Sequence, residues 1–485
     1  MKMKELQSDV VIIGAGIVGT ALAYELSHYE LSVIVVEKEA DVGWGATKAN
    51  SGIIHAAVHD LPSTFKGKFC SEGNKLYRQL ESELGIKLRK TGMLMVAEKE
   101  EQLGQLEKIK KTGLACGEKD LEILTKEELL AKEPALSPHV LAGLYAPSAA
   151  TTAPYQLAIA FFEGAQTNGV KFYFEEPVRK LKIKNKSIDQ VETTNFNIST
   201  KFVINAAGVK AGEIAGLAGC PLTIKPRAGE EYLLDKSYGD LVSHLIFPLP
   251  TLNSKGILAI PTVDHNLMVG PTAVEGLGSH ATTDEGREEV FRSIGKLLPQ
   301  INSQGTIASF TGVRPAPPEG DFIIGSTDVG GFYLAAGMES PGLTAAPAVA
   351  KYLVAKMQED GLSATRKKEM KKRIPPLRLH DLGEGELAEL ISENPSWGKI
   401  VCRCEEVTEA EIIEAIRRGA TTLDGIKFRT RLGMGRCQGG FCGPRVLSIL
   451  ARELAVDKRA ISKKGQDTQI APLTREQLLE EVEGQ

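Results

Sequence analysis

The pattern of hydrophobic and polar residues near the start of the chain predicts a βαβ unit. Residues 9–13 form a short run in which β-branched apolar residues follow Asp9, as expected for a strand that is buried on both faces. Three glycines follow within residues 14–19, and the apolar pattern up to about Tyr29 predicts a helix. Residues 32–37 predict a second buried strand, which completes the unit.

The same pattern continues along the chain. Residues 154–170 predict a helix, residues 171–174 a strand, and residues 202–208 another buried strand that ends in small residues. Residues 220–304 are rich in strand patterns that are separated by proline and glycine turns. We expect this last region to form a sheet that covers the substrate.

Composition narrows the possible classes of protein. The chain has 485 residues, 42% hydrophobic and 25% charged, which suits two or three globular domains. A net charge of -4 gives no basic field, so nucleic acid is not an expected partner. The apolar segment 10–23 is too short for a transmembrane segment, and no signal-peptide pattern surrounds it. We therefore expect a cytoplasmic protein.

A dinucleotide-binding motif lies between the first strand and the first helix. Gly14-Ala15-Gly16-Ile-Val-Gly19 is a G-x-G-x-x-G sequence, in which glycines let the backbone approach a pyrophosphate at a helix N-terminus. Glu37 ends the next strand, where a carboxylate accepts hydrogen bonds from ribose hydroxyls. The motif is common to FAD and NAD sites.

Three later stretches favour FAD. Residues 44–52 supply small hydroxyl and amide groups, residues 205–208 permit a second close backbone approach, and residues 325–344 end in a glycine-bounded turn before a helix. A second G-x-G-x-x-G after a later strand is missing from the sequence, which disfavours direct use of NAD.

With these features, residues 8–350 resemble the glycine oxidase and D-amino-acid oxidase superfamily of FAD enzymes. The resemblance implies adenosine and pyrophosphate contacts from Gly14, Ala15, Gly16, Gly19, Glu37 and Lys38, and an adenine contact through the backbone of Val178. It implies further cofactor contacts from Thr47, Asn50, Ser51, Gly52, Ala207, Gly208, Gly337, Gly342, Leu343 and Thr344.

Three side chains are candidates for substrate chemistry. His55 follows the presumed flavin contact, and histidine titrates near neutral pH, as a proton-abstracting base requires. Arg314 and Lys255 lie in proline- and glycine-bounded turns, where either can also be an ordinary loop charge. A guanidinium and an ammonium together suit a carboxylate or a phosphate, so we expect a small anionic substrate.

Within the superfamily, the chain looks most like the FAD-dependent glycerol-3-phosphate dehydrogenases and oxidases, especially the anaerobic-type catalytic subunits. The matching stretches are residues 50–55, 254–262, 267–272, 313–316 and 339–347. The resemblance implies that His55 is the base, with Lys255, Arg314 and Ser340 around the substrate. It also implies oxidation of glycerol 3-phosphate at C2 to dihydroxyacetone phosphate, with hydride transfer to the flavin.

Other activities stay open at this point. L-2-hydroxyglutarate oxidation is the chief alternative, because its carboxylates can bind the same cations. Oxidation of an amine such as glycine, sarcosine or proline is a weaker alternative. An electron-transfer protein without its own substrate is a further possibility, although such a protein has no need of His55, Lys255 and Arg314.

Four of the seven cysteines cluster in the last fifth of the chain. Cys402 and Cys404 form a C-x-C pair, and Cys437 and Cys442 form a C-x4-C pair. Four thiolates bind either a 2Fe-2S cluster or zinc, and the surrounding glycines favour the cluster. Residues 398–453 resemble the bacterioferritin-associated-ferredoxin type of 2Fe-2S domain. Between the pairs, residues 408–418 predict a helix that is capped by Thr408 and Glu411.

The expected fold class is α/β, with a Rossmann-like FAD-binding domain, a mixed-sheet substrate domain and a small helical 2Fe-2S domain. The expected boundaries are 1–355 for the oxidoreductase, 356–396 for a linker, 397–455 for the cluster domain and 456–485 for a tail with an acidic helix at 474–481. FAD-binding segments are expected at about 8–85, 150–220 and 305–355, and substrate-domain segments at about 86–149 and 221–304.

A cluster implies that electrons leave the flavin singly. We therefore expect a dehydrogenase with a redox partner subunit rather than a peroxide-forming oxidase. Peripheral membrane association through that partner is compatible with the sequence.

Overall fold

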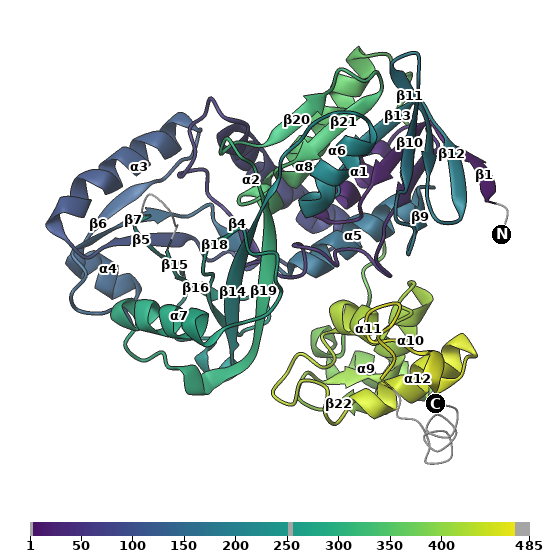
Figure 1. Ribbon diagram of the computed structural model, residues 1–485. Helices are drawn as coiled ribbons and strands as arrows, with labels where there is room; N and C mark the ends of the chain where they lie inside the picture. The colour runs from purple at the N-terminus through teal and green to yellow at the C-terminus, as the bar shows by residue number, and fades with distance from the viewer. Residues whose placement is uncertain (1–2, 251–255, 471–485) are drawn as a thin grey trace, which may run out of the picture. The chain divides into compact units, whose positions relative to one another are not determined.

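The computed structural model describes residues 3–250 and 256–470 and divides into two compact units (Figure 1). Unit 1 comprises Met1–Lys38 and Val42–Pro375, and unit 2 comprises Glu39–Asp41 and Pro376–Gln485. Lys255 and the predicted helix at 474–481 lie outside the described residues. Within the described ranges, no helix has the length and apolar character needed to cross a membrane.

A six-stranded sheet forms the centre of the nucleotide-binding part of unit 1. Its strand order is β20-β21-β13-β2-β3-β9, and β2, β3, β9, β13 and β21 run parallel. The strands are β2 (Val10–Ile13), β3 (Val33–Val36), β9 (Lys171–Tyr173), β13 (Phe202–Asn205), β20 (Ile323–Ser326) and β21 (Phe332–Ala336). The predicted βαβ unit is therefore confirmed, with α1 (Ile17–Leu26) between β2 and β3.

Both faces of this sheet are covered. On one face, α1 packs against α5 (Pro154–Thr167) and α8 (Gly342–Glu359), and α8 also packs against α2 (Phe65–Leu84). On the other face, alternate residues of β2 and β3 form a core with a four-stranded sheet and α6 (Ala211–Leu217). That sheet has the order β1-β12-β11-β10 and consists of β1 (Lys4–Gln7), β10 (Lys180–Lys184), β11 (Ser187–Glu192) and β12 (Phe196–Ser199).

A nine-stranded sheet forms the second part of unit 1, with the order β18-β14-β17-β16-β15-β5-β7-β6 and with β19 paired to β14. Its strands are β5 (Met93–Ala97), β6 (Glu122–Thr125), β7 (Ala142–Ala146), β14 (Lys225–Leu234), β15 (Leu245–Pro248), β16 (Leu258–Pro261), β17 (Leu267–Gly270), β18 (Val274–Glu275) and β19 (Thr306–Ala316). In Figure 1 this sheet lies beside α3 (Leu103–Ala115), α4 (Lys126–Lys132) and α7 (Asp284–Leu297).

The two faces of the nine-stranded sheet have different neighbours. One face packs on α7 through Val290, Ile294 and Leu297. The opposite face packs on Leu106 of α3 and on Ile53, which belongs to the short strand β4 (Ile53–Ile54) that pairs with β8 (Ala150–Thr151). This second face therefore meets the segment that leads to His55.

Strand β19 differs from its sequence-based assignment. Its residues were expected in an FAD-binding segment, yet β19 pairs with β14 along almost its whole length and so belongs to the nine-stranded sheet. The segment around Arg366–Arg373 was expected in the linker, but it is part of unit 1. Arg366 forms an isolated antiparallel β-bridge with Tyr29, and Arg373 forms an ion pair of 2.7 Å with Glu163.

Unit 2 is a small helical module with its own hydrophobic core. It contains α9 (Glu384–Glu393), α10 (Glu409–Arg417), α11 (Leu423–Thr430), α12 (Gly443–Leu454) and the paired strands β22 (Ile400–Cys402) and β23 (Val407–Thr408). The predicted capping of α10 is confirmed, because the Thr408 hydroxyl accepts a hydrogen bond from the Glu411 amide and the Glu411 carboxylate accepts one from the Thr408 amide.

Candidate functional site

The turn after β2 requires glycine at two of the motif positions. Gly14 has φ +102°, and a Cβ there would lie 2.6 Å from the carbonyl oxygen of Ala206. A Cβ on Gly19 would lie 1.9 Å from the carbonyl oxygen of Gly14. The strand, turn and helix can pack this closely only without side chains, which leaves the backbone of the turn open to a phosphate ligand.

Polar contacts fix the backbone of this turn. The amide of Ala15 donates to the Glu37 carboxylate over 2.6 Å, and the amide of Ile17 donates to the Thr47 hydroxyl over 2.9 Å. Helix α1 begins after Gly16 with no side-chain cap and no acidic residue in its first turn. The positive end of the helix dipole is thus available to a pyrophosphate.

The loop before β4 is held by its own amide groups. Asn50 donates to the carbonyl oxygens of Ala46 and Thr47, and its side-chain oxygen accepts from the amide of Gly52. Gly52 has φ +65°, and a Cβ there would lie 2.3 Å from the Thr152 carbonyl oxygen. These contacts fix the direction in which the chain continues toward His55.

The start of α8 provides the second helix end of the site. The helix begins at Gly342 with no side-chain cap and no acidic residue in its first turn. The Leu343 carbonyl accepts a hydrogen bond from the Tyr77 hydroxyl, and the buried Thr344 hydroxyl donates to the carbonyl of Ile53. Two helix N-termini without acidic residues in their first turns, together with glycine-lined turns, fit the pyrophosphate and the electron-rich ring of FAD.

His55 is buried and held from several sides. Its backbone amide donates to the Thr344 hydroxyl over 2.9 Å, and its carbonyl accepts from the Asn74 amide group over 2.9 Å. Its ring nitrogen Nε2 lies 3.2 Å from the Ser340 hydroxyl oxygen. The structure therefore brings together His55, Ser340 and Thr344, which were named from separate stretches of sequence.

Arg314 lies beside a glycine pair in the β14–β19 ladder. Gly229 and Gly312 are directly opposite each other in the register. A Cβ on Gly229 would lie 2.8 Å from a terminal nitrogen of Arg314, and a Cβ on Gly312 would lie 1.9 Å from the Ala49 carbonyl oxygen. The arginine also donates to the Thr272 carbonyl over 2.8 Å. The missing side chains make room for the guanidinium and for the loop that precedes Asn50.

Sequence reasoning missed Glu231, which is hydrogen-bonded to one predicted residue, Ser51, and lies within electrostatic reach of another, Arg314. The carboxylate is 2% exposed, and it accepts a hydrogen bond of 2.8 Å from the Ser51 hydroxyl. Burial raises its pKa to about 7, and the hydrogen bond from Ser51 and the nearby positive charge of Arg314 partly offset that rise. A single glutamate within a strand pattern gives no indication that its side chain will be buried beside Ser51 and Arg314.

A chain of ion pairs lies next to Ser340 and was also missed. Glu339 pairs with Lys66 over 2.8 Å and with Arg227 over 3.2 Å, and Arg227 pairs with Glu275 over 2.7 Å. Burial lowers the pKa of Arg314, while Glu339 and Glu231 raise it. Two carboxylates, Glu231 on β14 and Glu339 in the loop before α8, thus favour the charged form of Arg314.

The remaining predicted cofactor residues lie at the edges of the nucleotide-binding sheet. Lys38 is exposed, whereas Val178 is half-buried and packs on the core shared with the four-stranded sheet. The Ala207 amide donates to the Asn205 side chain, and Gly208 has φ +57°. Lys255 lies outside the described residues.

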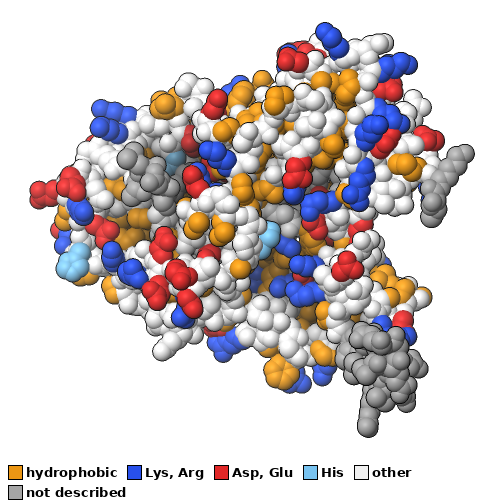
Figure 2. Space-filling view, viewed as in Figure 1, with side chains coloured by type: hydrophobic (Ala, Val, Ile, Leu, Met, Phe, Trp, Pro, Cys, Tyr) orange, Lys and Arg blue, Asp and Glu red, His pale blue; other side chains and the backbone are white. Residues whose placement is uncertain are grey.

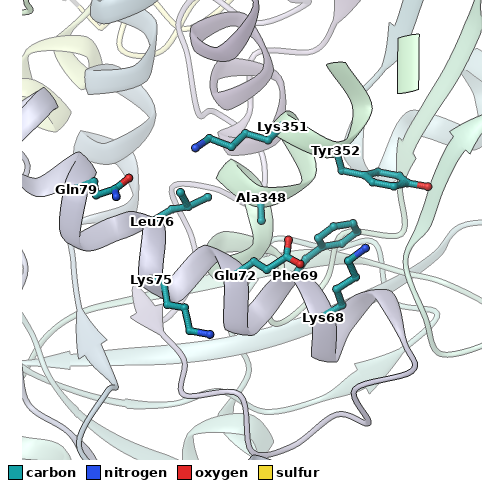
Figure 3. Close-up of a pocket in the computed structure, with 9 residues that line it drawn as sticks. All are labelled: Lys68, Phe69, Glu72, Lys75, Leu76, Gln79, Ala348, Lys351 and Tyr352. Atoms are coloured by element: carbon teal, nitrogen blue, oxygen red, sulfur yellow. The ribbon is translucent and has the colours of Figure 1, made fainter. Parts of the chain in front are cut away.

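A separate hollow of about 490 Å³ lies between α2 and α8 (Figure 3). Its floor includes Phe69, Leu76 and Ala348, and the ammonium group of Lys68 lies 5.5 Å from the centre of the Tyr352 ring. None of its lining residues was predicted as a site residue.

Over the visible surface, basic and acidic side chains are interspersed (Figure 2).

The four cysteines of unit 2 lie close together. The sulfur atoms of Cys402 and Cys404 are 3.8 Å apart, and those of Cys404 and Cys437 are 3.9 Å apart. Cys442 immediately precedes α12, and a Cβ on Gly435 would lie 2.6 Å from the Cys404 sulfur. The glycine-rich loop is therefore shaped around the thiols.

The electrostatics of the loop favour thiolates at two positions. A hydrogen bond from Cys442 and backbone amides of Gly433 and Glu405 lower the pKa of Cys402 to about 5. Backbone amides of Phe441 and Gly439 lower the pKa of Cys437. The thiolate is the form that binds metal.

The thiols present fit a [2Fe-2S] group. Cys402, Cys404, Cys437 and Cys442 supply four sulfur donors, and glycines border them closely enough for backbone amides to approach bound sulfide. Four thiolates are the ligand set of such a cluster.

Comparisons with known proteins agree with both parts of the chain. Residues 9–356 match the family described as FAD dependent oxidoreductase, and residues 400–452 match the BFD-like [2Fe-2S] binding domain. The glycerol 3-phosphate dehydrogenase of Caloramator mitchellensis is 40% identical over 469 residues, which cover 94% of this chain and 96% of that protein.

Two further relatives cover different shares of the chain. The anaerobic glycerol-3-phosphate dehydrogenase subunit A1 of Haloferax volcanii is 26% identical over 92% of this chain and 83% of its own. The structure of L-alpha-glycerophosphate oxidase from Mycoplasma pneumoniae with FAD bound superposes with a TM-score of 0.72 at 31% identity, covering 76% of this chain and all of that one.

These matches confirm the expected fold class, the enzyme class and both cofactors, FAD and a [2Fe-2S] cluster. The chain belongs to the FAD dependent oxidoreductase family and carries a BFD-like [2Fe-2S] binding domain at its C-terminal end.

Proposed function

We propose that the protein oxidises sn-glycerol 3-phosphate at C2 to dihydroxyacetone phosphate. The observation that carries the proposal is the His55–Ser340 pair, with Nε2 and Oγ 3.2 Å apart beside the start of α8. The named activities of the relatives that cover most of the chain support the same substrate.

In this mechanism His55 removes the proton of the C2 hydroxyl through Nε2, where the substrate hydroxyl takes the place that the Ser340 hydroxyl occupies in the free protein, and Ser340 lies beside the substrate. The hydrogen bonds from Asn74 to the His55 carbonyl and from the His55 amide to Thr344 keep the ring in place. FAD held by the turn after β2 and the start of α8 would supply the acceptor for the hydride that leaves C2. Arg314 binds the phosphate, and Lys255 adds a second positive charge.

The proposal extends to the route of the electrons. Cys402, Cys404, Cys437 and Cys442 would hold the [2Fe-2S] cluster, which would supply one-electron transfer toward a partner protein. The lowered pKa values of Cys402 and Cys437 support their role as thiolate ligands. The multi-subunit name of the Haloferax relative supports the existence of a partner.

The deciding experiment is anaerobic reduction of the flavin, followed by its absorbance. We expect glycerol 3-phosphate to bleach the flavin of the FAD-loaded protein, whereas L-2-hydroxyglutarate, glycine, sarcosine and proline leave it oxidised. Replacing the base in His55→Asn should slow bleaching by about 10²- to 10⁴-fold while FAD stays bound.

Bleaching by L-2-hydroxyglutarate but not by glycerol 3-phosphate would overturn the substrate assignment. An undiminished rate in His55→Asn would remove the histidine from the mechanism.

A further inference from the structure

Glu231 lies on the face of the nine-stranded sheet that contacts Ala49 and Ser51 in the loop before β4. Side chains alternate along β14, so Arg227, Gly229 and Glu231 share one face. Arg227 reaches Glu339, Gly229 makes room for Arg314, and Glu231 accepts the hydrogen bond from Ser51. Glu231 therefore faces the same region as the residues proposed to bind the substrate.

Its neighbour Glu230 faces the other way and is fully engaged. Its carboxylate accepts hydrogen bonds from the Tyr232 hydroxyl and from the hydroxyl and amide of Thr283, which precedes α7. Glu230 is thus a structural residue on the α7 side. The two adjacent glutamates therefore have different environments: Glu230 contacts the residues next to α7, and Glu231 contacts Ser51 on the opposite face.

Two buried polar atoms on this side of the sheet are unsatisfied. The second carboxylate oxygen of Glu231 and the Nε of Arg314 have no hydrogen-bond partner among the described residues. A buried polar atom without a partner costs about 1–3 kcal/mol, and more when the group is charged. The Glu231 oxygen is a hydrogen-bond acceptor, and the other oxygen of the same carboxylate is bonded to Ser51. The Arg314 Nε is a cationic donor and belongs to the guanidinium that is proposed to bind the phosphate.

We propose that Glu231 is a specificity-determining residue that accepts a hydrogen bond from the terminal C1 hydroxyl of the substrate. The inference rests on the proposed function and deepens it. One substrate that carries an anionic group for Arg314 and a free hydroxyl for Glu231 satisfies both open atoms. The substrate class is therefore a hydroxylated monophosphate rather than a hydroxy acid with two carboxylates.

Above pH 7, where its carboxyl is ionised, the charge of Glu231 explains the discrimination. A substrate with a second carboxylate places that group against a buried carboxylate, and like charges in a desolvated site repel strongly. A substrate without the terminal hydroxyl leaves the Glu231 oxygen unpaired. Both kinds of analogue are disfavoured by the same side chain.

The test compares glycerol 3-phosphate with propane-1,2-diol 1-phosphate, which lacks only the terminal hydroxyl. Anaerobic flavin reduction gives kcat/KM for each compound with the FAD-loaded full chain. We expect wild type to prefer glycerol 3-phosphate by about 100-fold or more. In Glu231→Gln the preference should fall by about 10-fold, because a neutral amide binds the hydroxyl more weakly than a carboxylate does.

Glu231→Ala extends the series and should lower the preference below about 10-fold. Glu230→Gln is the matched control: it alters a buried glutamate one position away, and it should leave the preference at the wild-type value. FAD content and thermal unfolding confirm that each variant is folded.

The outcomes separate the inference from the function on which it rests. If both Glu231 variants slow the two compounds equally, Glu231 only positions Ser51, and the specificity role is wrong. If wild type oxidises both compounds equally well, the inference also fails while the proposed function stands. If glycerol 3-phosphate does not reduce the wild-type flavin at all, the proposed function itself fails.

Discussion

At the scale of single residues, the buried carboxyl of Glu231 couples stability to pH. Its pKa is raised from 4.5 to about 7 by burial. Between these values the folded protein holds a proton that the unfolded chain has released, so stability falls as pH rises through this window. The full effect above pH 7 is on the order of 3 kcal/mol.

The change that checks this is Glu231→Gln, which mimics the protonated carboxyl at every pH. We expect the unfolding temperature of wild type, relative to the variant, to drop as the pH is raised from about 5 to 8. Thermal unfolding of the FAD-loaded proteins in matched buffers measures the difference. A wild-type curve that stays parallel to the variant across this range would contradict the assignment.

Residues near recognisable motifs were predictable, and isolated ones were not. His55, Ser340 and Thr344 lie in stretches whose resemblance marked them, and the fold places them together. Glu231 belongs to no motif. Its significance arises only when β14 pairs with β19 and turns that face toward Ser51, which is information that no local pattern contains.

At the scale of elements, the contact between β19 and the loop before Asn50 depends on Gly312. A methyl group there would lie 1.9 Å from the Ala49 carbonyl oxygen, so Gly312→Ala must displace either the strand or the loop. We expect a loss of about 1–3 kcal/mol of stability and less FAD retained per chain. Thermal unfolding and the ratio of flavin to protein absorbance measure both effects.

Gly216→Ala in α6 is the control for this change. A Cβ at Gly216 meets nothing within 4 Å, and the position lies inside a helix, so alanine should stabilise the protein by about 0.5–1 kcal/mol. Full FAD retention and an unchanged unfolding temperature in Gly312→Ala would mean that the loop tolerates displacement.

The elements differ in how far the sequence reveals them. The βαβ unit and the capped helix α10 were predictable because their signals are local: glycine spacing, apolar runs and a capping box. The placement of β19 was not, since an apolar strand carries no mark of the sheet that it will join. Its pairing is set by the ten-residue partner strand β14, more than 70 positions earlier.

At the scale of the whole molecule, the proposed electron route gives a test that spans both cofactors. After anaerobic addition of glycerol 3-phosphate, we expect the wild-type protein to develop the paramagnetic signal of a reduced [2Fe-2S] cluster. Cys437→Ser should lose that signal and still show flavin bleaching at the wild-type rate, because no residue of unit 1 is changed.

Cys220→Ser is the matched control for this variant. Cys220 is half-buried in unit 1 and lies outside the cluster loop, so the variant should keep both the cluster signal and the flavin reduction. Complete flavin bleaching in wild type without any cluster signal would show that substrate electrons do not reach the iron.

The interleaved strand order of unit 1 has a consequence for synthesis of the protein on the ribosome. Strand β2 begins at Val10, but the sheet that contains it is finished by β21 at Ala336, and the helix end at Gly342 follows later still. At about 5–20 residues per second, the pyrophosphate turn emerges roughly 15–65 s before α8. We therefore expect a nascent chain to capture FAD only late in translation, after the glycine turn has waited for its distant partner.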